Sequence, residues 1–397
     1  MKTTRFSLLV CFAVCASFLT SADANHRTGT LALPEEMVTG DFNQDGNLDL
    51  AVNVTGFDNI AIFTGDGAGG LTLTGHIATN TLPKGLATAD INRDGHLDLI
   101  EANTWGYTGL VYSGDGKGAF NVLKEVKGDG EPTRLVAQDF NNDGRLDLAF
   151  NSPDEGIMQL YLGDGKGGFS IPSIEVEDLK TNFAIAAADL NNDGNQDILI
   201  SFLVSTLADG SRIAVLLGDG TGNFNRGADL TVNQLPVSIR IADLNHDGKL
   251  DFVVAGAQPN NSEGNYISTF LGDGTGNFTL KQTITLGPGS LKGDIALGDF
   301  NEDGNLDAAF PQTGGASTTM LMFFGNGTGG LIAGPAITVG EEPHTAVAGD
   351  FNKDGHLDVV VSNRTDGTII LLFGDGTGNF PTSTLFSVVC PTLEACQ

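Results

Sequence analysis

The stretch "DFNQDGNLD", residues 41–49, decides how this sequence folds. It places Asp41, Asn43, Asp45 and Asp49 within nine residues, and the apolar run "LAV" follows directly. Carboxylates held this close together repel one another, so a bound cation is expected to compensate them. Gly46, at the sixth position, allows the positive φ that a tight turn requires. The stretch therefore predicts a cation-binding loop that leads straight into a β-strand.

The same phrase occurs seven times, always as D-x-N-x-D-G-x-x-D. The copies begin at Asp41, Asp90, Asp139, Asp189, Asp243, Asp299 and Asp350, at intervals of 49 to 56 residues. A second, glycine-rich phrase such as "LGDGTGNF" follows each copy within its repeat. Seven repeats of this length indicate a propeller or a solenoid. We expect the glycine-rich phrases to be hairpin turns, whose trailing Phe anchors the next strand; a second cation site is the alternative.

Each repeat reads as four short strands. A small apolar run such as "LATA" (86–89) precedes the acidic loop, and a continuous apolar run such as "LDLAV" (48–52) follows it. The first suits a crowded central axis, and the second suits a strand buried on both faces. We therefore predict an all-β fold: one seven-bladed β-propeller with four-stranded antiparallel blades, formed by residues 25–397. "GTLAL" (29–33) and "STLFSVV" (383–389) compete for the outer strand where the ring closes.

Residues 1–24 have the pattern of a cleaved signal peptide. Lys2 and Arg5 precede the apolar run 6–19, and Ala22-Asp23-Ala24 offers a cleavage site. We therefore expect a monomer that is secreted, periplasmic or at the cell surface, with no membrane span in the mature chain. In an exported protein, Cys390 and Cys396 are expected to form a small disulfide-closed ring, with two free thiols as the alternative.

The charge balance argues against several classes of partner. The chain has 49 Asp and Glu against 20 Lys and Arg, a net charge of −29. Binding to nucleic acid or to an anionic membrane surface needs cationic side chains. The acidic excess indicates bound cations instead.

The seven acidic loops are predicted to hold up to seven structural Ca²⁺ ions. Oxygen ligands at positions 1, 3, 5 and 9, with a backbone carbonyl at position 7, suit Ca²⁺, which accepts six to eight oxygens in loose geometry. An EF-hand requires Glu at position 12, which is apolar in six copies and Glu101 in one. The alternative is an Asx-rich turn that binds nothing. The predicted ligands are Asp41, Asn43, Asp45, Asn47 and Asp49; Asp90, Asn92, Asp94, His96 and Asp98; Asp139, Asn141, Asp143, Arg145 and Asp147; Asp189, Asn191, Asp193, Asn195 and Asp197; Asp243, Asn245, Asp247, Lys249 and Asp251; Asp299, Asn301, Asp303, Asn305 and Asp307; and Asp350, Asn352, Asp354, His356 and Asp358.

Together, the acidic loop and the glycine-rich phrase resemble the FG-GAP/VCBS repeat proteins, whose best-known relatives are the integrin α-subunit propellers. The resemblance covers residues 30–390. It implies a propeller fold and calcium in the acidic loops. Asn326 replaces the aspartate of the sixth glycine-rich phrase, a departure that removes no calcium ligand. The family includes adhesion receptors, lectins and a few carbohydrate-processing enzymes, so the resemblance does not imply one activity.

Chain direction places the acidic loops and glycine-rich turns on one face, the calcium face, and the remaining connections on the opposite, long-loop face. Three aromatic residues of the long-loop face are candidate ligand contacts: Trp105 and Tyr107 in "NTWGYTG" (103–109), and Tyr266. An exposed aromatic pair suits stacking on a sugar, and a local plug over the blade end is the alternative. The charged residues of this face are Asp58, Lys84, Arg134, Lys180, Arg212, His344 and Arg364.

These observations predict a non-catalytic, calcium-stabilised binding module for extracellular glycan or protein ligands, of the lectin or adhesion kind. The alternative is a secreted carbohydrate-active enzyme on the same scaffold. A polysaccharide lyase, with a Tyr or His base and an Arg, is the first choice among such enzymes. The sequence contains no nucleophile elbow and no HExxH motif, so no catalytic residue is assigned.

Overall fold

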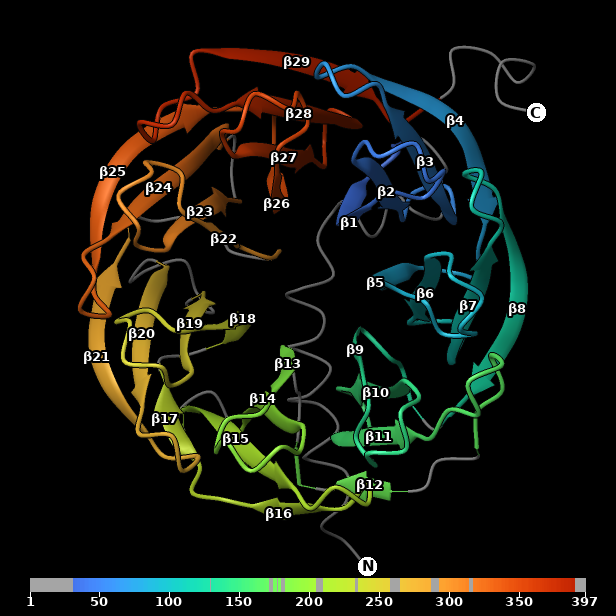
Figure 1. The fold of residues 1–397 in the computed structure, drawn as a ribbon, viewed down its shortest axis with the longest axis vertical. Helices are drawn as coiled ribbons and strands as arrows, with labels where there is room; N and C mark the ends of the chain where they lie inside the picture. The colour runs from blue at the N-terminus through green and yellow to red at the C-terminus, as the bar shows by residue number, and fades with distance from the viewer. Residues whose placement is uncertain are drawn as a thin grey trace, which may run out of the picture.

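The computed structural model describes residues 31–389, except 129, 171–173, 177, 180–182, 205–209, 233–234, 258–264, 287–292 and 314–316. In this part of the chain all regular structure is β, and seven sheets surround one axis (Figure 1). The predicted seven-bladed propeller is confirmed. With no helix among the described residues, none of them forms an apolar helix long enough to cross a membrane. The predicted signal peptide, Lys180 and the two C-terminal cysteines lie outside the described residues.

Every blade is built from consecutive strands, ordered from the axis outward. Blades 1 to 3 contain β1 (Pro34–Gly40), β2 (Asp49–Val54), β3 (Asn59–Gly65) and β4 (Leu71–Ala78); β5 (Pro83–Ala89), β6 (Asp98–Asn103), β7 (Thr108–Gly114) and β8 (Phe120–Lys127); and β9 (Arg134–Gln138), β10 (Asp147–Ser152), β11 (Ile157–Tyr161) and β12 (Ile174–Val176). Blades 4 and 5 contain β13 (Ile185–Ala188), β14 (Asp197–Leu203), β15 (Ser211–Gly218), β16 (Phe224–Arg226) and β17 (Leu230–Val232); and β18 (Pro236–Ala242), β19 (Asp251–Gly256), β20 (Tyr266–Gly272) and β21 (Phe278–Thr285). Blades 6 and 7 contain β22 (Ala296–Gly298), β23 (Asp307–Gln312), β24 (Thr319–Gly325) and β25 (Leu331–Thr338); and β26 (Pro343–Gly349), β27 (Asp358–Asn363), β28 (Thr368–Phe373) and β29 (Thr382–Ser387).

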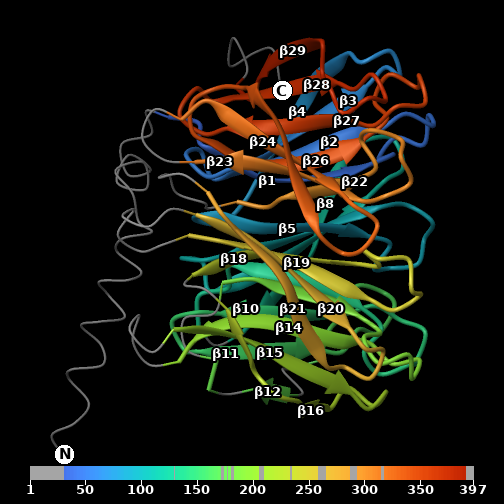
Figure 2. The ribbon, with the colours of Figure 1, turned by 90° about the vertical axis from the view of Figure 1, so that its left-hand side faces the viewer.

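Burial follows the position of each strand in its blade. The second strands, such as β2 and β27, are buried along their whole length, as their continuous apolar sequences predict. The fourth strands, such as β4 and β21, alternate toward exposed residues at the rim. In blade 4 the outer position is shared by β16 and β17, which both pair with β15. Figure 2 shows the ring edge-on, with its two faces on opposite sides.

The glycine-rich phrases are hairpin turns, as predicted, and they also clamp neighbouring blades together. The amide of Gly118 in blade 2 donates to the Phe42 carbonyl in the acidic loop of blade 1 (3.1 Å). The same bond joins blade 1 to blade 7, blade 4 to blade 3, and blade 7 to blade 6. Phe120, the trailing residue of the phrase, packs edge-on against Phe42, with ring centroids 5.4 Å apart. In these four blades the phrase therefore holds the blade against the acidic loop of the preceding one.

Among the described residues, blades 1 and 7 close the ring without exchanging a strand. The C-terminal β29 is the outer strand of blade 7, while Ala32 and Leu33 accept backbone hydrogen bonds from the β2–β3 turn of blade 1. The first and last blades lie side by side (Figure 1). The Ser362 hydroxyl donates to the Glu35 carbonyl across this junction (2.9 Å). Closure therefore rests on contacts between blades 1 and 7, including the backbone bond from the Gly69 amide to the Phe351 carbonyl (3.2 Å). The outer strand of blade 7 is formed by the C-terminal segment.

Candidate functional site

The acidic loops connect the first and second strands of their blades. Their side-chain oxygens accept backbone amides of the same loop. In blade 1, the Asp41 carboxylate accepts the amides of Asp45 (3.0 Å) and Gly46 (2.9 Å). Asn43 Oδ1 accepts the Asp45 amide (2.9 Å), and Asp45 Oδ1 accepts the Asn47 amide (2.8 Å). The Asp45 amide therefore draws the side-chain oxygens of positions 1 and 3 together.

The ninth-position aspartate is the buried member of each loop. Asp49 Oδ2 accepts the Phe42 amide (2.9 Å), while Oδ1 accepts the amide of Gly65, which begins the glycine-rich phrase (2.9 Å). Both bonds recur in all seven blades at 2.8 to 3.0 Å. This carboxylate thus ties the acidic loop to the glycine-rich turn of its own blade.

These loops fit a hard cation, on two observations. Burial, reinforced by neighbouring loop carboxylates, raises the pKa of Asp147 and of Asp197 to about 6, so the chain itself leaves this charge poorly compensated. Each carboxylate oxygen has a second lone pair beyond the one that accepts an amide. Within the described residues, however, no group of three or more His, Cys, Asp or Glu side chains comes close enough together to hold a metal ion, so the three aspartates of a loop do not form a closed cage by themselves.

The structure separates the three aromatic candidates. Tyr107 lies in the β6–β7 turn with 51% of its surface exposed, and its hydroxyl donates to Glu131 Oε1 (3.2 Å). Trp105, in the same turn, is half-buried. Tyr266 is 1% exposed and packs in the core cluster of blades 4 and 5 with Phe252. Tyr266 is therefore a core side chain, and proposing it as a surface ligand contact was wrong.

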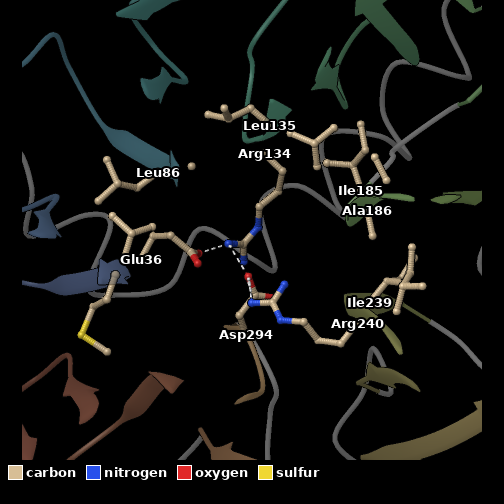
Figure 3. A pocket seen from close by; sticks show the side chains of 15 residues that line it. Glu36, Leu86, Arg134, Leu135, Ile185, Ala186, Ile239, Arg240 and Asp294 are labelled. Atoms are coloured by element: carbon tan, nitrogen blue, oxygen red, sulfur yellow. Dashed lines mark hydrogen bonds and ion pairs between the residues drawn. The ribbon is translucent and has the colours of Figure 1, made fainter. Parts of the chain in front are cut away.

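A second constellation lies on the axis, where the inner strands surround a cavity of about 300 Å³, here called the axial pocket (Figure 3). Its charged lining consists of Glu36 from β1, Arg134 from β9, Arg240 from β18 and Asp294, which precedes β22. Because each inner strand ends at the calcium face, residues near or before its start lie toward the long-loop face. Glu36, Arg134 and Asp294 therefore stand toward that face.

The charged groups of the axial pocket are paired with one another. Arg134 Nη1 forms an ion pair with Glu36 Oε2 and lies 3.4 Å from Asp294 Oδ2. Arg240 Nη2 lies 3.1 Å from the same Asp294 oxygen, and its Nε donates to the Ile295 carbonyl (3.1 Å). Burial opposes ionisation of Asp294, but the two guanidinium groups outweigh it and hold its pKa below the usual range. Asp294 is therefore ionised near neutral pH, between the two arginines.

A buried network adjoins this pocket. Glu35 is paired with Lys84 (2.8 Å) and with Arg364 (2.7 Å), and these two cations hold its pKa far below the ordinary value despite its burial. Burial lowers the pKa of His344 to about 3, so its ring is neutral. Four of the charged residues predicted for the long-loop face, namely Lys84, Arg134, His344 and Arg364, are thus brought together at the axis.

Two other charged candidates lie away from the axial group. Asp58 accepts the Leu82 amide at the blade 1–2 connection (2.8 Å), and Arg212 contacts the Thr231 hydroxyl in blade 4.

Sequence reasoning missed Glu35, Glu36, Arg240 and Asp294. A signal was present: Glu36, Arg134 and Asp294 each stand five residues before the first aspartate of an acidic loop. Comparison of the inner strands in register would have shown charged residues where other copies carry small or apolar ones. Their spacing from the loops indicates a common height on the axis, whereas only the structure shows which blades face one another.

The fold and the repeated loops define the class: a seven-bladed β-propeller whose blades each carry an acidic loop and a glycine-rich turn. The model of the FG-GAP-like repeat matches residues 41–101, 139–200, 202–254 and 243–310, together more than half of the chain. The protein belongs to the FG-GAP-like repeat family. No curated protein matches the sequence.

Solved structures share the architecture at low sequence identity. A lectin from Agrocybe aegerita, studied for recognition of non-reducing terminal N-acetylglucosamine, is 18% identical with a TM-score of 0.52, covering 84% of this chain and 87% of its own. A Bacteroides fragilis protein named "putative 6-phosphogluconolactonase" is 14% identical with a TM-score of 0.60, covering 89% and 94%. A functionally unknown protein from Desulfotomaculum acetoxidans is 11% identical with a TM-score of 0.56, covering 78% and 90%. These likenesses show a common fold alone and carry no information about activity.

Proposed function

We propose that this protein is an exported, calcium-stabilised binding module that recognises an extracellular glycan or protein through its long-loop face. The observation that carries the proposal is the axial pocket, where charged side chains from four blades converge on a cavity at the centre of a rigid ring. A concave site with a few fixed polar groups and apolar walls is how proteins commonly hold small ligands or parts of larger ones.

The two faces are suited to different tasks. On the calcium face the same loop geometry recurs in every blade, with the same two hydrogen bonds to the ninth-position aspartate. A surface fixed by metal geometry has little freedom to specialise. Calcium would be held by the oxygens of positions 1, 3, 5 and 9, where it would neutralise the carboxylates and stiffen the ring. The long-loop face carries the exposed ring of Tyr107. Three charged residues of the axial pocket, Glu36, Arg134 and Asp294, also lie toward this face.

Binding is favoured over the alternative of a polysaccharide lyase. A lyase needs a Tyr or His base close to the Arg that neutralises the substrate carboxylate. Among the described residues, no Tyr or His lines the axial pocket. The neighbouring His344 is 6% exposed and bonded to the Thr345 hydroxyl (3.2 Å). The arginines are present, while a base with access to a substrate is not found beside them.

A glycan array and a set of extracellular matrix proteins, probed with the mature protein in millimolar Ca²⁺, test the proposal. We expect saturable binding to a subset of the targets without turnover. Incubation with acidic polysaccharides, followed by the ultraviolet absorbance of unsaturated products, tests the lyase. Product formation, or no binding to any glycan or protein, would overturn the proposed function.

A further inference from the structure

We propose that the axial pocket takes a neutral, polyhydroxylated unit, such as an uncharged sugar residue. This inference rests on the proposed function and names the ligand class of its site. It starts from the charge of the lining, which is balanced: Arg134 and Arg240 stand against Glu36 and Asp294. An ionic ligand of either sign would lose its hydration and meet as much repulsion as attraction.

The surroundings modify this balance only slightly. Glu35, Lys84 and Arg364 add one negative and two positive charges next to the pocket, and the Glu35 and Arg364 side chains are each 2% exposed. The axial group therefore sums to +1, in a chain whose net charge is −29. Because none of these three residues lines the pocket, a ligand in it would not contact the extra charge directly.

The paired groups are suited to hydroxyl recognition. A guanidinium presents several N–H donors in a planar fork, and a carboxylate offers several acceptor positions. Vicinal hydroxyls can both donate to and accept from such a pair without carrying a charge into the site. Arg240, at 37% exposure, retains the largest contact with solvent among the four side chains.

The remaining walls are aliphatic. Leu86, Leu135, Ile185 and Ile239 lie above and to the right of the charged groups in Figure 3 and come from four different inner strands; none is more than 9% exposed. Such a wall suits the C–H surface of a sugar ring. The volume of about 300 Å³ is at the low end for ligand pockets, which matches one small unit rather than a long chain segment.

The site is also preorganised. Its four charged side chains come from blades 1, 3, 5 and 6, so their spacing is fixed by the ring and not by one flexible loop. Ordering costs on binding are correspondingly small.

The test uses methyl glycosides as probes and isoleucine methyl NMR as readout. The probes are neutral methyl hexosides and N-acetylhexosaminides, the anionic methyl glucuronide, and the cationic methyl glucosaminide. We expect neutral probes to shift the Ile185 and Ile239 methyl signals saturably and to bind at least tenfold more tightly than both charged probes. Ile332, 58% exposed on β25 at the rim, is the internal control and should not respond.

Two variants make the test specific. Ala186→Leu adds bulk to the lining without removing a charge, and it should abolish the shift of Ile239. Glu36→Gln leaves Arg134 and Arg240 against Asp294 alone, and it should move the preference toward methyl glucuronide by about tenfold. No response to any neutral probe, a preference of the unmodified protein for a charged one, or neutral binding that Ala186→Leu spares would overturn the inference. In the last case the proposed function survives with its ligand elsewhere, whereas failure of the array removes both.

Discussion

Arg364 Nη2 lies 2.7 Å from Glu35 Oε1 across the junction of the last and first blades, and both side chains are only 2% exposed. Lys84 of the second blade contacts the same carboxylate at 2.8 Å. Within the described residues no strand is exchanged between blades 1 and 7. This buried pair, the Ser362 bond, the backbone bond from Gly69 to Phe351 and the apolar cluster around Met37 and Val360 therefore hold the ring closed.

Arg364→Met should therefore destabilise the protein strongly. Removing one partner of a buried pair typically costs about 3–5 kcal/mol, because the other charge stays buried. We expect the lower end of that range, since Lys84 remains beside Glu35. Urea unfolding measures the effect. Arg226→Met, which breaks a more exposed pair with Asp229 (2.9 Å), is the control and should cost less than about 1 kcal/mol. Equal losses in the two variants would show that the junction pair does not hold the ring.

The clamp between blades predicts different costs for two equivalent glycines. Gly69 and Gly118 have φ values of 86° and 87°, and both donate to the preceding acidic loop. A Cβ on Gly69 would lie 2.4 Å from the Phe373 ring, whereas one on Gly118 would meet Asn43 no closer than 3.7 Å. Alanine costs about 1–2 kcal/mol at either position through the left-handed backbone. Gly69→Ala should lose a further 1–3 kcal/mol, roughly, from overpacking. Thermal unfolding of the pair checks this, and indistinguishable midpoints would contradict the clamp geometry.

Calcium should stabilise the ring, and the number of ions bound to the native state should fall by one when the acidic loop of one blade is mutated. In the saturating range, the free energy of unfolding should rise with ln[Ca²⁺] by RT per ion bound to the native state. We expect a slope near seven RT for the unmodified protein and one RT less for Asp139→Ala. Asp164→Ala removes the aspartate of the glycine-rich phrase of the same blade, whose Oδ1 accepts two amides at 2.8 Å. It should keep the full slope. Stability independent of Ca²⁺ and EDTA would mean that the loops are Asx turns.

The architecture was predictable because each repeat contains the sequence pattern of one complete blade. Seven copies of Asp-x-Asn-x-Asp-Gly-x-x-Asp fix the number of blades, and the runs around them fix which strands are buried. The contacts that could not be predicted are those between residues of different repeats, because they depend on which repeats lie next to one another in space. The bond from Gly118 to Phe42 and the group of Glu36, Arg134 and Asp294 join residues 76 to 258 positions apart, and no local pattern encodes those meetings. Tyr266 was wrongly placed on the surface for a related reason. Its position next to a loop in the sequence does not reveal that its aromatic side chain points into the core.

Glu101 predicts a pH dependence of stability. It stands at the one copy of position 12 that is not apolar, is fully buried in β6, and accepts the Tyr112 hydroxyl at 3.0 Å. Burial raises its pKa from 4.5 to about 8. Between these values the native state holds a proton that the unfolded state releases, so stability falls as pH rises, by up to about 1.4 kcal/mol per pH unit.

Glu101→Gln should remove this slope and be more stable than the unmodified protein at pH 8. Urea unfolding at pH 5, 6, 7 and 8 in saturating Ca²⁺ measures the difference between the two proteins. A difference that does not change with pH would show that Glu101 is ionised in the native state.

The last prediction concerns the two aromatic side chains of the β6–β7 turn, which the structure does not treat alike. Half of the Tyr107 surface is exposed, and its hydroxyl is anchored on Glu131 (3.2 Å), while Trp105 is half-buried. If the ligand on the long-loop face extends over this turn, Tyr107 is the better stacking surface and Trp105 its support. Tyr107→Ala should weaken binding of a glycan found on the array by about 1–3 kcal/mol and leave the melting temperature nearly unchanged. Tyr107→Phe, which keeps the ring and loses only the bond to Glu131, is the matched control and should bind nearly normally.

Trp105→Ala should lower the melting temperature as well as affinity, because it removes packing under the turn. Full affinity in Tyr107→Ala would confine recognition to other parts of the face, and a ligand that is lost only on chelation while the fold survives would place recognition on the calcium ions.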